Sequence, residues 1–220
     1  MALLSLSNAH LAFGHVALLD DASPAVHVAG ACNAVRRDAR GLLVGEQFDG
    51  AGFVRGIQRK GFDVRGCTAL VVGAGGVGCA IAASLAGAGV GALRLIDENA
   101  ALAEQLRERL ALHHPAIEVS TGSRDPRGCD LVVNATPLGM NDGDPLPFDV
   151  SLLSASTFVG EVVMRREVTP LLAAAQARGC RVQVGTDMLF EQIPAYLEFF
   201  GFPSTTPQAL RATARLPADG

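Results

Sequence analysis

The sequence lacks the features that mark nucleic-acid-binding, secreted and membrane-spanning proteins. Its formal net charge is −4 and its pI is near 5.7, so it has no excess of basic residues to contact a phosphate backbone. No run of about 18 apolar residues occurs that would cross a membrane. The apolar start, residues 1–13, has no basic n-region and is interrupted by Asn8 and His10, which disfavours a signal peptide. We therefore expect a cytoplasmic protein whose partners include neither nucleic acid nor a membrane.

Paired cysteines and clustered histidines are missing as well. Five cysteines are scattered without a single Cys-x-x-Cys pair: Cys32, Cys67, Cys79, Cys129 and Cys180. This spacing favours free thiols in a reducing compartment and predicts no structural metal site. Hydrophobic residues make up 49% of the 220 residues, enough for the core of one α/β domain or of one domain and part of another.

From residue 67 onward, short runs with strand character alternate with helical patterns. The expected strands are residues 68–72, 92–96, 117–120, 131–134, 157–163 and 181–184, and the expected helices are 80–88, 100–113 and 170–178. Strands that alternate with helices predict an α/β fold with a doubly wound parallel sheet. Upstream, residues 35–44 read as two short strands around a charged turn, followed by a helix at 53–60, and a last long helix is expected at 188–200.

A glycine-rich segment directly after the first of these strands predicts a dinucleotide site. It reads Gly73-Ala74-Gly75-Gly76-Val77-Gly78 and opens a helix. Gly73 permits the tight turn, Gly75 lets backbone N–H groups approach a pyrophosphate, and Gly78 allows close packing of helix on strand. The helix N-terminus then faces the two phosphates with its partial positive charge. We assign Gly73, Gly75, Gly76, Val77 and Gly78 to the cofactor.

The end of the second strand indicates which dinucleotide binds. Asp97 stands where an acidic residue accepts hydrogen bonds from the adenosine ribose. A 2′-phosphate would be repelled by Asp97 and Glu98, and the next arginine in the sequence is Arg107. The pattern favours NAD, with NADP as the alternative.

Four further segments resemble the shikimate dehydrogenase family, which includes quinate/shikimate dehydrogenases. Residues 134–139 resemble that family's Asn-Ala-Thr-x-x-Gly loop, and residues 185–192 its Gly-x-x-Met-Leu-x-x-Gln segment. Residues 29–34 are similar to Gly-Ala-Val-Asn-Thr, and residues 45–53 to Gly-x-Asn-Thr-Asp-Gly-x-Gly-Phe. These motifs occur in the family's order, and the resemblance covers about residues 16–215.

The resemblance implies hydride transfer between a nicotinamide cofactor and a shikimate- or quinate-type cyclic polyol. It places Asp49 at the position of the catalytic aspartate, and Asn33 and Gln192 at substrate-binding positions. It adds Asn134, Ala135, Thr136, Gly185, Met188 and Leu189 to the cofactor site. It also implies three regions: a partial substrate-binding domain (1–52), an NAD-binding Rossmann domain (53–187), and C-terminal helices that return to the substrate domain (188–220).

Several positions depart from the family pattern. The family pairs its aspartate with a lysine. Counting back from Ser23-Pro24 places this lysine near Ala12, whereas the only lysine of the chain is Lys60. His10 or His15 could substitute as a proton-exchanging group. Gln47 and Phe48 replace Asn-Thr before Asp49.

Glu161 and Met164 stand where the family often has Asp and Tyr. The early Ser-x-Ser substrate motif is absent too. A partial substrate domain would expose strand edges, which a partner subunit in a homodimer, or the rest of a longer gene product, would cover.

The sequence thus leaves two hypotheses open. The first is an NAD-dependent dehydrogenase of the shikimate/quinate type. The second is a catalytically silent dinucleotide-binding protein, or a truncated fragment, that keeps the cofactor site without the lysine.

Overall fold

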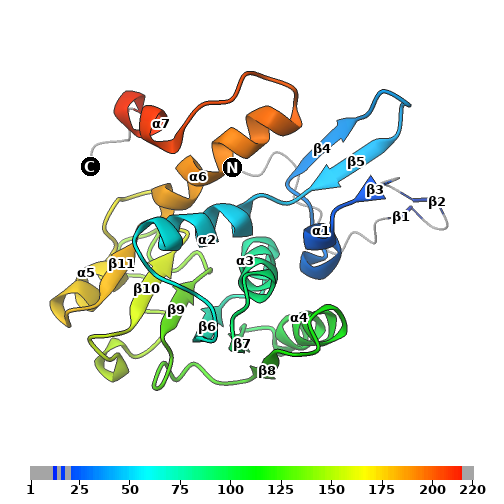
Figure 1. Cartoon of the computed structure of the whole chain (residues 1–220). Helices are drawn as coiled ribbons and strands as arrows, with labels where there is room; N and C mark the ends of the chain where they lie inside the picture. The colour runs from blue at the N-terminus through cyan, green and yellow to red at the C-terminus, as the bar shows by residue number, and fades with distance from the viewer. Residues whose placement is uncertain (1–11, 14–15, 18–20, 215–220) are drawn as a thin grey trace.

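A six-stranded parallel sheet forms the centre of the protein in this computed structural model, which describes residues 12–13, 16–17 and 21–214 (Figure 1). Its strands are β6 (Thr68–Val72), β7 (Ala92–Ile96), β8 (Glu118–Thr121), β9 (Leu131–Asn134), β10 (Phe158–Glu161) and β11 (Arg181–Gln183). They lie in the order β11-β10-β9-β6-β7-β8, and every neighbouring pair is parallel. The predicted doubly wound sheet is confirmed. Successive strands are added in one direction from β6 to β8 and in the other from β9 to β11, so the strand order reverses between β6 and β9. At such a point, sheets of this type bind ligands at the carboxyl ends of their strands.

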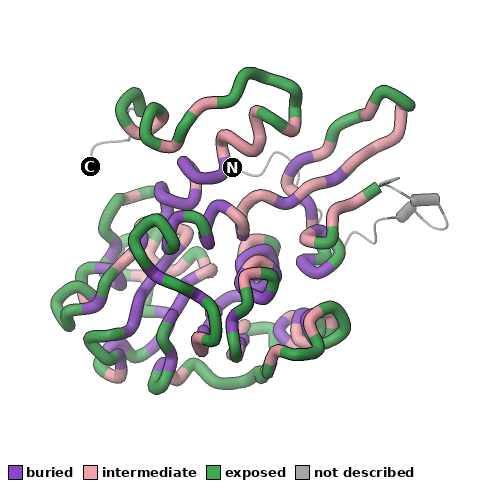
Figure 2. Tube along the Cα trace, viewed as in Figure 1, coloured by how far each residue is buried: buried purple, intermediate pink, exposed green. Residues whose placement is uncertain are grey.

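Helices cover both faces of this sheet, because the strands are apolar on both sides. In β6, Ala69 and Val71 pack into a core with α2 (Asp49–Arg59), α3 (Gly76–Gly87) and α4 (Ala100–His113). Leu70 and Val72 point the other way, into a core with α5 (Pro170–Ala177) and the short 3-10 helix η1 (Val150–Leu152). Figure 2 shows buried residues along the strands between these two layers.

A smaller, three-stranded sheet is formed by residues that precede the main sheet in the sequence. Its strands β3 (Asp21–Ala22), β4 (Ala34–Arg37) and β5 (Leu43–Glu46) have the order β3-β5-β4. The β4–β5 hairpin confirms the two strands expected around a charged turn, and it extends away from the main sheet (Figure 1). Strands β1 (Ala12–Phe13) and β2 (Val16–Ala17) form a separate antiparallel pair.

One arginine connects this sheet's helix, α1 (Pro24–Ala29), to the larger part of the protein. Arg109 of α4 donates hydrogen bonds from Nε to the carbonyl of Val28 (2.9 Å) and from an Nη to that of Ala29 (3.3 Å). A cation at carbonyls of a helix C-terminus is a favourable arrangement, because those carbonyls carry a partial negative charge.

Helix α2 begins at Asp49, four residues before the expected start at 53. The expected start was wrong because glycine is a poor helix former, so the helix was expected to begin only after Gly50 and Gly52. Both glycines instead allow close packing. A Cβ at Gly50 would lie 1.9 Å from the carbonyl oxygen of Ala80 in α3, and one at Gly52 would lie 2.7 Å from that of Met188. Met188 belongs to α6 (Gly185–Phe199), which also begins earlier than expected, and the short α7 (Pro207–Thr213) follows it.

None of the helices in the described ranges is both long and apolar enough to cross a membrane. The domain boundaries at 52/53 and 187/188 stay predictions.

The close contact of α2 with α3 leads to a test by substitution. We expect Gly50→Ala to destabilise the fold by about 2–4 kcal/mol, because the added methyl overlaps backbone that cannot move aside. Gly87→Ala in α3 is the matched control, since a Cβ there meets no atom within 4 Å, and it should change stability by at most about 1 kcal/mol. Urea unfolding of both variants measures the difference. Equal stabilities would show that α2 and α3 are not packed this closely.

Candidate functional site

The glycine-rich turn connects β6 to α3 at the carboxyl edge of the sheet. Gly73 has φ +105°, and a Cβ there would lie 2.8 Å from the carbonyl oxygen of Ala135. A Cβ at Gly78 would lie 1.9 Å from the oxygen of Gly73, so this position has no room for a side chain. Gly75 and Gly76 are exposed, with nothing within 4 Å of a Cβ. The turn is therefore closed on its protein side and open in front of the α3 N-terminus, which is the arrangement that the predicted dinucleotide site requires.

The loop after β9 lies against this glycine-rich turn. Both segments were expected to bind the same cofactor, and this requires them to be neighbours. The backbone N–H of Ala135 donates to Val72 (2.8 Å). Asn134 is fully buried and holds the loop through its side chain: its Oδ1 accepts from the Thr136 hydroxyl (2.6 Å) and its Nδ2 donates to Leu138 (2.9 Å). Asn134 therefore orients the loop, while Ala135 and Thr136 lie nearest the glycines.

Asp97 lies beside the same turn. Its Oδ2 accepts a hydrogen bond from the backbone N–H of Ala74 (2.7 Å), and the residue stays partly exposed at the end of β7. Contrary to the expectation from the linear spacing, a basic residue does lie near Asp97 and Glu98. Arg124, which follows β8, is 3.8 Å from Glu98. Because β7 and β8 are parallel neighbours, the residues that follow their carboxyl ends lie close together. The number of residues between Glu98 and Arg124 does not indicate this proximity.

Asp49, Asn33 and Gln192 come together from three separate segments. Asp49 is the first residue of α2, Gln192 lies on α6, and Asn33 directly precedes β4. Burial raises the pKa of the Asp49 carboxyl, and the nearby amides of Asn33 and Gln192 oppose that shift only in part. Asn33 Nδ2 and Gln192 Oε1 are buried without a hydrogen-bond partner among the described residues. A carboxyl group with two incompletely satisfied amides suits a ligand that carries several hydroxyls.

The two residues before Asp49 that depart from the family pattern have clear structural roles. Gln47 is buried, and its Oε1 accepts from the backbone N–H of Asp49 (3.0 Å), which caps α2. Phe48 packs on Tyr196, with ring centroids 4.8 Å apart, and on Phe199 at 5.6 Å. Tyr196 was not among the residues expected at this site. Its spacing of four residues from Gln192, one helical turn, was the available signal.

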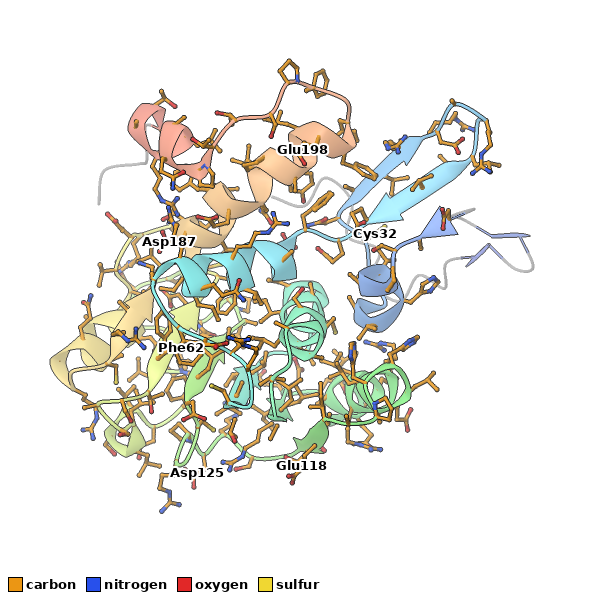
Figure 3. All side chains as sticks on the ribbon, in the orientation of Figure 1. Cys32, Phe62, Glu118, Asp125, Asp187 and Glu198 are labelled. Atoms are coloured by element: carbon orange, nitrogen blue, oxygen red, sulfur yellow. The ribbon has the colours of Figure 1, made fainter. Side chains whose placement is uncertain are left out.

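An ion-pair network joins α6 to the C-terminal end of α2 and to α7, and Figure 3 labels one of its members, Asp187. Asp187 lies 2.9 Å from Lys60 and 2.8 Å from Arg211, while Glu191 lies 2.9 Å from Arg59. Burial acts to raise the pKa of Asp187, but the hydrogen bonds of Lys60 and Arg211 outweigh it and lower that pKa. Lys60, the only lysine of the chain, is thus paired with the buried Asp187 and contributes to the packing of α6.

The residues expected beside the nicotinamide lie at the carboxyl ends of β10 and β11. Gly185 is packed so closely that a Cβ would lie 2.1 Å from the carbonyl oxygen of Val163, which follows β10. Met188 is buried and Leu189 is half-buried. Their contact with a cofactor stays a prediction. Ala12 lies in β1, and His10 and His15 lie outside the described residues.

Glu161 is a fully buried carboxyl group at the end of β10, opposite Asn134 of β9. Its Oε2 accepts from the Thr169 hydroxyl (2.9 Å), but its Oε1 has no hydrogen-bond partner in the described part of the chain. Burial raises the pKa of Glu161 to about 7, against the weaker opposing effects of Thr169 and Asn134.

Comparison with known proteins identifies the family. The chain is 39% identical to the shikimate dehydrogenase (NADP(+)) of Rubrobacter xylanophilus over 80% of its own length and 63% of the relative's. It is 36% identical to the quinate/shikimate dehydrogenase (NAD(+)) of Corynebacterium efficiens over 89% of its own length and 71% of the relative's. The chain belongs to the shikimate dehydrogenase family. It spans roughly two thirds of the length of these relatives.

Solved structures agree with this assignment. Shikimate 5-dehydrogenase of Listeria monocytogenes, in complex with shikimate and NAD, superposes with a TM-score of 0.81 at 26% identity, covering 89% of this chain and 71% of that one. A model of the ThiF family also matches residues 56–107, the segment from α2 to the middle of α4 that contains the glycine turn.

Glu161 gives a pH-dependence that unfolding measurements can detect. Because its pKa in the folded state lies above the ordinary value of 4.5, the protonated form stabilises the fold. That contribution is complete below pH 4.5 and is lost as the pH rises through 7, a change of about 3 kcal/mol. Urea unfolding between these limits should show this loss in the parent chain and not in Glu161→Gln. Glu118→Gln, at an exposed position, should keep the parent's profile, and an identical profile for Glu161→Gln would contradict the assignment.

Proposed function

We propose that this chain is an NAD-dependent dehydrogenase that oxidises a ring hydroxyl of a shikimate- or quinate-type polyol, and reduces the corresponding ketone. The convergence of Asp49, Asn33 and Gln192 carries this proposal. The relatives named above support it, since their names assign them to shikimate and quinate.

The nicotinamide, when bound, supplies the hydride acceptor. Asp49 accepts the hydrogen bond of the reacting hydroxyl and takes its proton as the carbon–hydrogen bond breaks, so that the alcohol becomes a ketone. A pKa raised by burial brings Asp49 nearer to neutral pH, which favours proton exchange in both directions. Asn33 and Gln192 contribute amide donors and acceptors that position the neighbouring hydroxyls.

We propose NAD as the cofactor because the residues around the expected ribose site are mainly negatively charged. Asp97 is held beside the glycine turn by its bond to Ala74, where it accepts from ribose hydroxyls and repels a 2′-phosphate. Arg124 lies 3.8 Å from Glu98, and we propose that the carboxylates of Asp97 and Glu98 together outweigh this single cation. The relatives divide on this point, one named for NADP and one for NAD.

A catalytically silent dinucleotide-binding protein is the second candidate, because Ala12 stands where the family pattern has its lysine. The homodimer suggested by the sequence also stays a proposal, which sedimentation of the purified chain would test.

Steady-state kinetics distinguishes the two candidates. We expect the purified chain to reduce NAD with shikimate or quinate, and Asp49→Asn to lower kcat by about 10²–10⁴-fold, because the variant cannot take the proton. Asp63→Asn is the matched control, since Asp63 forms an exposed pair with Arg65, and it should keep the parent's kcat. Binding of NAD by calorimetry without turnover of either polyol would favour the silent protein.

Cofactor choice is tested separately by titrating NAD and NADP into the chain. NAD should bind at least about tenfold more tightly, and Asp97→Asn should reduce this preference because one negative charge is removed. Asp130→Asn is the control. Asp130 also accepts from a backbone N–H, that of Thr68, but at the opposite end of the sheet. Tighter binding of NADP by the parent chain would refute the role of Asp97.

A further inference from the structure

Tyr196 lies on the same face of α6 as Gln192. The two residues are four positions apart, so their side chains are neighbours along the helix. Gln192 in turn packs on α2, because a Cβ at Gly52 would lie 2.9 Å from its Cβ. The α6 face that carries Gln192 and Tyr196 therefore adjoins the first turn of α2, where Asp49 begins the helix.

The ring of Tyr196 is fixed in this position by an aromatic contact. It packs against Phe48, the residue directly before Asp49, with ring centroids 4.8 Å apart and an interplanar angle of 59°. Tilted pairs at this separation are favourable. The contact ties the Tyr196 ring to the backbone that carries Asp49.

The Tyr196 hydroxyl has no hydrogen-bonding role in the described part of the fold. It makes no hydrogen bond with any residue that the structure describes, although the side chain is half-buried. Buried tyrosine hydroxyls usually have a partner. Burial, and then the charge of Asp49, raise the pKa of the phenol, so the hydroxyl keeps its proton at neutral pH and remains a donor.

We propose that Tyr196 contacts the substrate and donates a hydrogen bond to the same ring oxygen whose proton Asp49 takes. A ring hydroxyl can donate to Asp49 and accept from Tyr196 at once, because its oxygen has one proton and two lone pairs. As the proton moves to Asp49, negative charge develops on this oxygen and strengthens the bond from Tyr196. Tyr196 keeps its own proton throughout, since tyrosinate beside the Asp49 carboxylate is unfavourable. This role rests on the proposed dehydrogenase function.

Removing one hydroxyl tests the inference. Tyr196→Phe keeps the ring against Phe48, so the midpoint of thermal unfolding should stay within the parent's range. We expect kcat to fall about 10–100-fold, while the affinity for NAD measured by calorimetry stays unchanged. Ser204→Ala removes a hydroxyl that bonds to the Pro194 carbonyl, away from Asp49, and should leave kcat unaltered. An unaltered kcat for Tyr196→Phe would overturn the inference.

The composition allows a second measurement that needs no turnover. The chain has one tyrosine, so carbon-13-labelled tyrosine gives the signals of Tyr196 alone. Addition of shikimate without NAD should shift the resonance of its hydroxyl-bearing Cζ, and the Ser204→Ala variant should show the same shift. If calorimetry shows that shikimate binds but the Cζ resonance does not shift, the proposed contact between Tyr196 and the substrate is contradicted. Absence of turnover by the parent chain would instead contradict the proposed function, and a Cζ shift in that case would still support a ligand contact at Tyr196.

Discussion

The packing of α2 between α3 and α6 is the constraint on which the candidate site depends. Glycines at positions 50 and 52 let the first turn of α2 approach the backbones of both neighbours more closely than any side chain would allow. Helix α3 begins at the glycine-rich turn, and α6 carries Gln192 and Tyr196. The closeness of α2 therefore sets the position of Asp49 relative to the cofactor edge and to the polar residues of α6. The proton transfer proposed for Asp49 needs this kind of fixed placement, because small displacements weaken proton transfer.

The buried carboxyl groups of the protein fall into two kinds. Asp187 and Glu191 are surrounded by Arg59, Lys60 and Arg211, and they stabilise the contact of α6 with α2 and α7. Asp49, partly buried beside α6, and Glu161, at the carboxyl end of β10, have only neutral hydrogen-bonding neighbours among the described residues, and burial raises the pKa of both. Ionised groups without an opposite charge are costly to bury. Groups of the first kind fit a structural role. Groups of the second kind have a raised pKa, and that of Glu161 reaches about 7.

The sequence was sufficient to predict the role of a residue where that role depends on its immediate neighbours in the chain. Gly73 and Gly78 follow directly from a strand–turn–helix, and the structure gives each the steric reason that the motif implies. The β4–β5 hairpin was likewise readable from its turn residues. Prediction failed where tertiary contacts decide: Gly50 and Gly52 are helical because close packing compensates for their poor propensity. Arg124 reaches Glu98, and Tyr196 reaches the neighbourhood of Asp49, only through the fold. Asn33, Asp49 and Gln192 were identified by resemblance, since their spacing alone indicates no site.

Helix geometry decides whether Lys60 can supply the missing cation. Asp49 and Lys60 are at opposite ends of α2, 11 residues apart, which corresponds to roughly 16 Å along a helix axis. A lysine side chain is too short to cover this distance, and Lys60 is already paired with the buried Asp187 at 2.9 Å. Withdrawing it would leave the buried Asp187 with one cation fewer. Among the described residues, the groups next to Asp49 are therefore neutral donors and acceptors: Asn33, Gln192 and Tyr196. Neutral donors stabilise a developing oxyanion less than an ammonium group does, but they also leave the pKa of Asp49 raised, which makes this carboxyl group a better proton acceptor than it would be in an ion pair.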